Sequence, residues 1–153
     1  MNSNTGNVMK KKAKQSHCLV LSGDIGGTSS RLQISLYENN QYSVLKLESF
    51  KNKQYTFFKE IVAEFLENHD VTSIDLACFA FAGPVLDGKV SLTNLPWAFV
   101  ESELEKELGI KHVVFLNDFT ANAHGISLLN EDDYIVLQQG KPDPAAVASI
   151  VGA

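Results

Sequence analysis

Residues 23–36, GDIGGTSSRLQISL, decide the fold, because two apolar stretches flank a pair of adjacent glycines. Residues 18–21 are mostly apolar, and after the glycines Leu32, Ile34 and Leu36 alternate with polar residues. Alternation with a period of two predicts a half-buried strand. Two glycines between such strands predict a tight turn that uses backbone dihedral angles disfavoured by side chains. The stretch therefore predicts an antiparallel hairpin.

The turn itself is compatible with two interpretations. Adjacent glycines are common in hairpin turns, so the turn can be purely structural. Alternatively, Gly26 and Gly27 let backbone N–H groups approach a phosphate, and Thr28, Ser29 and Ser30 add hydroxyl donors. Asp24 can help to hold Mg²⁺ through water. The stretch is neither a P-loop nor a G-x-G-x-x-G motif, since it lacks their spacing and the P-loop lysine. The turn alone leaves both interpretations open.

The composition indicates one globular domain with an acidic body. The chain has 153 residues, of which 44% are hydrophobic and 20% charged, with a net charge of −5. Residues 1–17 contain four lysines and no acidic residue, so the remainder carries a net charge of −9. An acidic body argues against nucleic acid or an anionic membrane as the main partner. We expect residues 1–17 to form a disordered basic tail.

The two cysteines and the apolar stretches indicate the compartment. Cys18 and Cys78 lack C-x-x-C spacing, so we expect reduced core thiols in a cytoplasmic protein. No apolar stretch approaches the length of a membrane span, so no membrane partner is expected.

The rest of the chain alternates helices and strands. Apolar periodicity and turn residues predict a third strand at 42–50, a helix at 55–69 with Thr56 as its N-cap, a strand at 74–81, a turn at Asp87-Gly88, a helix at 101–108 ended by Gly109, a strand at 112–116, a helix from Asn117, and final strands at 134–140 and 146–153. Three antiparallel strands followed by helices and parallel strands predict a mixed sheet of the α/β class.

Polar side chains follow the predicted strand 112–116. Asn117 and Asp118 stand where that strand ends and a helix begins, and ligands of α/β proteins bind beyond the carboxyl ends of strands. A carboxylate there can orient a hydroxyl and accept its proton during phosphoryl transfer. Asn and Asp are also favoured helix N-caps, so a purely structural role carries similar weight.

The stretch LTNLPWAF, residues 92–99, is a third candidate site. Asn94 has a side chain that can bind polar hydroxyls. Trp97 can pack on a sugar, but packing in the core is the favoured interpretation for a single tryptophan.

The motifs DIGGTSSR, AGPV, LTNLPWAF and NDFTA occur in this order, and together they resemble those of the bacterial glucokinases. These are ATP-dependent sugar kinases of the hexokinase, actin and heat-shock ATPase superfamily. The resemblance runs from about Cys18 to the last residue. It implies a ribonuclease H-like (actin-like ATPase) fold, with residues 18–117 as the small glucokinase domain and 118–153 as the incomplete start of the large domain.

The resemblance also implies roles for individual residues. Asp24 to Thr28 form the first ATP-phosphate loop, with Asp24 near Mg²⁺. Asp118 is the base that activates the 6-hydroxyl of glucose, Asn117 binds a sugar hydroxyl, and Asn94 is a weaker candidate for the same function. The implied reaction is the phosphorylation of glucose to glucose 6-phosphate in glycolysis, with glucose and ATP as partners. Selectivity against mannose and the oligomeric state stay open, a homodimer being one option at full length.

Two departures from the family pattern affect these expectations. Members usually have Asn after GGT, where this chain has Ser29, so we expect altered hydrogen bonding in the loop without loss of function. Members are also about twice as long, and the chain stops where their second glycine-rich loop begins. We therefore expect this chain to be inactive on its own.

Three alternatives stay open beside the kinase. A sugar-responsive repressor would carry a winged DNA-binding domain before the fold, and only a short polar tail precedes Cys18. An actin-like assembly or chaperone ATPase would not need NDFTA or LTNLPWAF, which suit a hydroxyl acceptor. A non-catalytic remnant of the same fold is compatible with the sequence.

Overall fold

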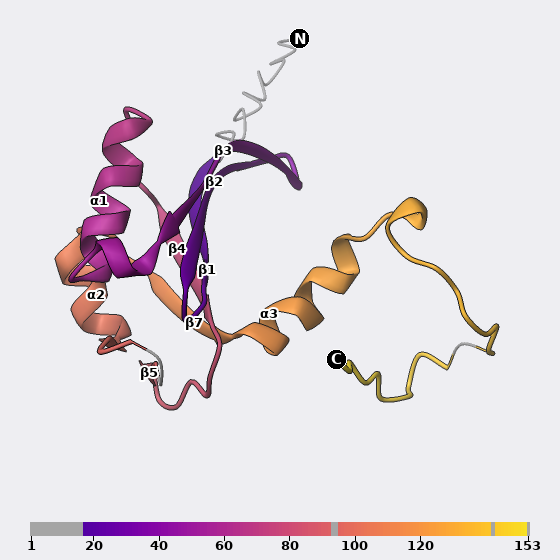
Figure 1. Ribbon diagram of the computed structural model, residues 1–153. Helices are drawn as coiled ribbons and strands as arrows, with labels where there is room; N and C mark the ends of the chain where they lie inside the picture. The colour runs from indigo at the N-terminus through magenta and orange to yellow at the C-terminus, as the bar shows by residue number, and fades with distance from the viewer. Residues whose placement is uncertain (1–16, 93–94, 142, 153) are drawn as a thin grey trace, which may run out of the picture.

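The computed structural model describes residues 17–92, 95–141 and 143–152 (Figure 1). Its elements are β1 (Cys18–Ile25), β2 (Ser29–Glu38), β3 (Gln41–Lys51), η1 (Asn52–Gln54), α1 (Phe58–Asn68), β4 (Leu76–Phe81), β5 (Lys89–Ser91), β6 (Ala98–Val100), α2 (Glu101–Leu108), β7 (Val113–Asn117), α3 (Asp118–Gly125), η2 (Ile126–Leu128) and η3 (Glu131–Asp133). The predicted tail falls almost entirely on residues 1–16, which lie outside the described ranges.

Five strands form one mixed sheet in the order β3-β2-β1-β4-β7, and β5 pairs with β6 in a separate hairpin. β1 pairs antiparallel with β2 and parallel with β4, and β4 pairs parallel with β7. β2 and β3 are antiparallel, with a register shift at Ile34/Ser35. The predicted hairpin and the mixed α/β sheet are therefore confirmed.

The turn between β1 and β2 corrects one expectation about its glycines. Among the described glycines, the positive φ angles belong to Gly88 and Gly109, so the turn at Gly26 and Gly27 does not use the left-handed region. Close packing explains one of these positions instead. A Cβ atom on Gly26 would lie 3.2 Å from the carbonyl oxygen of Ser29, to which the Gly26 N–H already donates.

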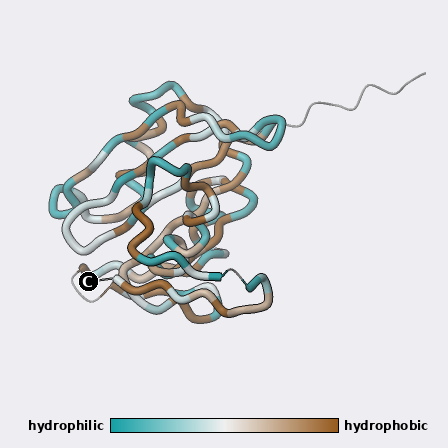
Figure 2. Tube along the Cα trace, turned by 90° about the vertical axis from the view of Figure 1, so that its right-hand side faces the viewer, coloured by the Kyte–Doolittle hydropathy of each residue, from teal (hydrophilic) through white to brown (hydrophobic). Residues whose placement is uncertain are grey.

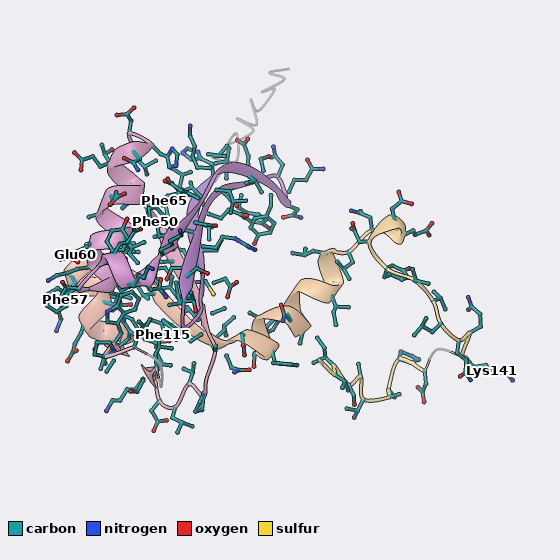
Figure 3. All side chains as sticks on the ribbon, viewed as in Figure 1. Phe50, Phe57, Glu60, Phe65, Phe115 and Lys141 are labelled. Atoms are coloured by element: carbon teal, nitrogen blue, oxygen red, sulfur yellow. The ribbon has the colours of Figure 1, made fainter. Side chains whose placement is uncertain are left out.

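The core lies on one face of the sheet, beneath α1 and α2 (Figure 1). In Figure 3, Phe50 and Phe65 point into the space between α1 and the sheet, with ring centroids 6.1 Å apart. Phe79 of β4 and Phe58 of α1 meet edge to face at 5.2 Å. In the hydropathy view hydrophobic and hydrophilic stretches alternate along the tube, and several of its outer turns are hydrophilic (Figure 2). Burial of these aromatic side chains, together with the aliphatic residues of the core, favours folding through the hydrophobic effect.

Helix α1 begins later than the sequence predicts, and Thr56 is not its N-cap. The N-cap is Phe57, whose side chain cannot accept a hydrogen bond. The carboxylate of Glu60 replaces a capping side chain, because its Oε2 accepts from the N–H groups of Thr56 at 2.9 Å and Phe57 at 3.0 Å. A carboxylate in the first turn also favours the positive end of the helix dipole.

The edge strand β7 is covered by acidic side chains of α2. Glu101 Oε1 accepts from the N–H of Phe115 at 2.6 Å, and Glu105 Oε1 accepts from the N–H of Val113 at 3.2 Å. Gly109 ends α2 with a φ of 67°, as predicted. Unpaired edge N–H groups can recruit foreign strands, and these carboxylates remove two of them.

The predicted strands at 134–140 and 146–153 are wrong for the residues that the structure describes. The described residues of both segments form no strand, and Leu137, Val147 and Val151 are at least 90% exposed. A strand needs a neighbour for its backbone hydrogen bonds, and neither segment finds one. In Figure 1 the C-terminal segment, drawn in yellow, runs away from the sheet and back toward α3.

Within the described ranges, no helix is long and apolar enough to cross a membrane.

Candidate functional site

The carboxyl ends of three parallel strands meet at one edge of the sheet. Ile25 of β1 is in register with Phe81 of β4, and Phe81 with Asn117 of β7. Neighbouring strands are about 4.8 Å apart, so the chain after β1 and the chain after β7 start about 10 Å from each other. The structure thus brings the glycine-rich turn and the Asn117-Asp118 pair to the same edge.

In the turn at residues 26–28, two carbonyl groups accept hydrogen bonds, and two N–H groups have no acceptor among the described residues. The Gly26 carbonyl accepts from Asn52 Nδ2 at 2.8 Å, and the Thr28 carbonyl accepts from Asn52 N at 3.0 Å. Among the described residues, no acceptor is found for the N–H groups of Gly27 and Thr28. Free backbone N–H groups at an exposed turn can bind an anion.

Asp24 lies at the end of β1, exposed, and opposite Arg31 of β2 in the register. Both line a hollow of about 240 Å³ on the sheet face opposite α1 and α2, and Ala121 of α3 borders the same hollow. In the described part of the chain, no three acidic, histidine or cysteine side chains group as a metal site. A single carboxylate fits Mg²⁺, which is usually bound by one or two carboxylates together with substrate phosphates and waters.

Asn117 is the N-cap of α3, as one of the two interpretations of this position predicts. Its Oδ1 accepts from the N–H groups of Phe119 at 3.1 Å and Thr120 at 3.3 Å. Its Nδ2 donates to the Gly83 carbonyl and to Asp118 Oδ1, both at 2.9 Å. The amide therefore ties the loop after β4 to the start of α3, and both hydrogens of its Nδ2 are engaged.

Asp118 is half-buried in the first turn of α3, where the helix dipole stabilises a negative charge. Its Oδ1 accepts from the Phe119 N–H at 2.9 Å and from Asn117 Nδ2. In the described structure, Oδ2 has no hydrogen-bond partner. The carboxylate is thus held by one oxygen and has the other available.

The third candidate stretch is only partly described. Asn94 lies outside the described residues. Trp97 is buried, with 6% of its surface exposed, and its Nε1 donates to the Thr56 carbonyl at 2.9 Å. Its packing role in the core is confirmed.

Sequence reasoning missed Asn52, which binds the glycine-rich turn. Asn52 is 1% exposed and lies two residues after the buried Phe50. The signal was present in the sequence: a strand with a period of two places residue 52 on the same face as residue 50, and a polar residue there needs a partner.

Both thiols are free, but they are half-buried and, contrary to the prediction from the sequence, do not belong to the core. Burial raises the pKa of the Cys78 thiol, and the Glu101 carboxylate raises it further. Burial, followed by the Asp75 carboxylate, raises the pKa of Cys18. Both thiols therefore stay protonated at neutral pH, which argues against nucleophilic catalysis by cysteine.

Comparisons with known proteins place this chain in a family. The family model for glucokinase matches residues 21–153. The glucokinase of Nostoc punctiforme is 39% identical over 136 residues, which cover 88% of this chain and 40% of that protein. The chain thus spans about 40% of the length of the curated relatives it matches.

Solved structures agree with this assignment. The crystal structure of glucokinase from an Antarctic psychrotroph has a TM-score of 0.74 at 27% identity, covering 82% of this chain and 40% of that one. A glucokinase of Balamuthia mandrillaris, solved in complex with glucose, has a TM-score of 0.51 at 25% identity, covering 77% of this chain and 34% of that one. These neighbours confirm the expected ribonuclease H-like, actin-like ATPase fold. The chain belongs to the glucokinase family.

Proposed function

We propose that this chain forms the N-terminal part of a glucokinase, which transfers the γ-phosphoryl group of ATP to the 6-hydroxyl of glucose. The observation that carries the proposal is the common register of Ile25, Phe81 and Asn117. It puts the glycine-rich turn and a carboxylate at one sheet edge, about two strand spacings apart. Phosphoryl transfer depends on this kind of positioning more than on covalent chemistry by the protein.

The turn at residues 26–28 would bind the phosphates. The N–H groups of Gly27 and Thr28 are free to donate to phosphate oxygens, and the Thr28 side chain adds a hydroxyl donor. Asp24 would hold Mg²⁺ through water, and the ion would neutralise charge on the phosphates. The single exposed carboxylate beside the hollow supports this assignment.

Asp118 would act on the sugar. Its Oδ2 is available to accept the proton of the 6-hydroxyl as that oxygen attacks phosphorus, while the bonds to Oδ1 keep the carboxylate in one orientation. Asn117 would bind a sugar hydroxyl, and its bonds to Gly83 and Asp118 hold it beside the carboxylate. Asn94 is a weaker candidate for the same function. The glucose found in the Balamuthia mandrillaris structure supports glucose as the acceptor.

The remaining expectations are part of the same proposal. Residues 18–117 would form the small domain, and residues 118–153 would begin the large one, with the active site in the cleft between them. Two free thiols support a cytoplasmic location. A homodimer is one assembly compatible with the full-length protein.

The decisive experiment replaces Asp118 by Asn. For activity measurements, we define the extended protein as this chain continued after Ala153 by the corresponding C-terminal part of the Nostoc punctiforme relative. In the extended protein, Asp118→Asn should lower kcat by about 10²-fold or more, because the amide cannot accept the proton. The KM for glucose should change much less, since the amide keeps the shape and one acceptor.

The matched control is Asp132→Asn, which removes an exposed carboxylate of the same segment. This variant should retain the parental kcat. An Asp118→Asn variant with kcat within about threefold of the parent would reduce Asp118 to a helix-stabilising residue.

A further inference from the structure

A buried polar pair lies beneath the glycine-rich turn. Ser30 and Asn52 are 0% and 1% exposed, and Ser30 Oγ donates to Asn52 Oδ1 at 2.8 Å. Buried polar groups are costly unless every one of them is paired. The pairing extends to the turn, because Asn52 Nδ2 donates to the Gly26 carbonyl at 2.8 Å and Asn52 N donates to the Thr28 carbonyl at 3.0 Å.

These bonds determine which way the turn presents its N–H groups. In a trans peptide unit the C=O and N–H point in opposite directions, and no described peptide bond is cis. The Gly26 carbonyl points inward to Asn52, so the Gly27 N–H of the same peptide unit points away from the core. That N–H has no acceptor among the described residues.

We propose that Asn52, oriented by Ser30, is a positioning residue that holds the glycine-rich turn in its anion-binding form. The identity of the anion, a nucleotide phosphate, rests on the proposed function. In the described structure the Ser29 side chain makes no hydrogen bond within the turn, and the amide that orders the turn comes from Asn52.

The test uses Asn52→Asp in the 153-residue chain. The carboxylate can still accept from Ser30, but it cannot donate to the Gly26 carbonyl and is repelled by it. Ser30→Ala is the milder second variant, because it removes only the hydroxyl that orients Asn52. Val62→Ala, a core change in α1 away from the turn, is the control for general destabilisation. Urea unfolding measures the free energy of unfolding of all three variants.

The first measurement is amide hydrogen exchange at Gly26 and at residue 52, whose N–H groups donate to Ser29 and Thr28. Relative to Val62→Ala, Asn52→Asp should speed exchange at both amides by about tenfold or more, the effect of losing one buried hydrogen bond, and Ser30→Ala by less. Exchange at these amides no faster than in Val62→Ala would overturn the proposal.

The second measurement is an NMR titration with MgATP, which separates this proposal from the proposed function. In the parent chain the Gly27 amide signal should shift on titration, and Asn52→Asp should weaken the apparent affinity by about tenfold. An equal affinity in parent and variant would overturn the positioning role. If the turn amides of the parent chain are protected from exchange but their NMR signals do not shift with MgATP, the proposed nucleotide site is contradicted. The exchange measurement still decides whether Asn52 orders the turn.

Discussion

Residues 18–117 and residues 118–152 both contain aliphatic and aromatic stretches, yet every buried side chain in the described ranges belongs to the first set. Leu21 and Phe79 are fully buried beneath α1 and α2, whereas α3, η2 and η3 contain no buried residue. In Figure 3, Phe115 of β7 lies in the folded body, whereas Lys141 lies on the distant C-terminal loop. An apolar stretch therefore becomes a strand or a core element only where a partner surface is present.

The largest effect on stability is expected when a core residue of the first segment is replaced, and an exposed residue of the second segment provides the comparison. Phe79→Ala removes a ring that packs on Phe58, and it should lower the free energy of unfolding by about 3–5 kcal/mol. Leu137→Ala changes a side chain that is 96% exposed, and it should alter stability by less than about 0.5 kcal/mol. Urea unfolding followed by the fluorescence of Trp97, the single tryptophan, measures both. Equal losses in the two variants would show that the C-terminal segment has a core of its own.

An intermediate effect is expected at the boundary between the segments. Glu101→Ala leaves the Phe115 N–H of β7 without its acceptor, which should cost about 1–3 kcal/mol of stability. Glu103→Ala, on the exposed side of the same helix, is the matched control and should be nearly neutral. Urea unfolding measures the stability of both variants. Similar stabilities would mean that the Glu101 carboxylate does not stabilise the edge strand β7.

The smallest effect on stability is expected for a substitution in the glycine-rich turn at residues 26–28. This substitution should act on ligand binding instead. The turn does not use positive φ, so Gly27→Val should leave the chain folded with little loss of stability. Its β-branched side chain should block the approach of a phosphate and raise the KM for ATP in the extended protein by about tenfold, the effect of losing one charge-assisted hydrogen bond. Circular dichroism verifies folding. An unchanged KM in the folded variant would make the turn purely structural.

The sequence predicts much of the fold because its strongest signals are local. Alternating residues around the glycines define β1 and β2, and Gly109 marks the end of α2. The errors arise where distant partners decide. Residues 134–140 have the apolar pattern of a strand, but pattern alone cannot tell whether a neighbouring strand is available. Thr56 is a good N-cap by type, yet the helix begins at Phe58 with Glu60 as the acceptor.

The candidate site was predictable in its residues and less so in its connections. Asp24 and Asp118 could be named as candidates because Asp24 lies near the end of one buried strand and Asp118 follows another. Parallel strands bring their carboxyl ends together. The bonds from Asn52 to Gly26 join positions 26 residues apart, and that pairing depends on the register of three strands. Local sequence carries no information on such a contact beyond the polarity of the buried residue.

The most direct test of the central claim is whether the turn and Asp118 face one ligand. Mn²⁺ with ATP, added to the isotopically labelled 153-residue chain, broadens the NMR signals of nearby amides. We predict that the signals of residues 26–28 and 118–120 broaden together at millimolar nucleotide, whereas those of the β2–β3 turn at Asn39 and Asn40, at the opposite edge of the sheet, stay sharp. Broadening confined to one of the two segments, centred on the opposite edge, or absent from both would contradict a shared phosphoryl-transfer site.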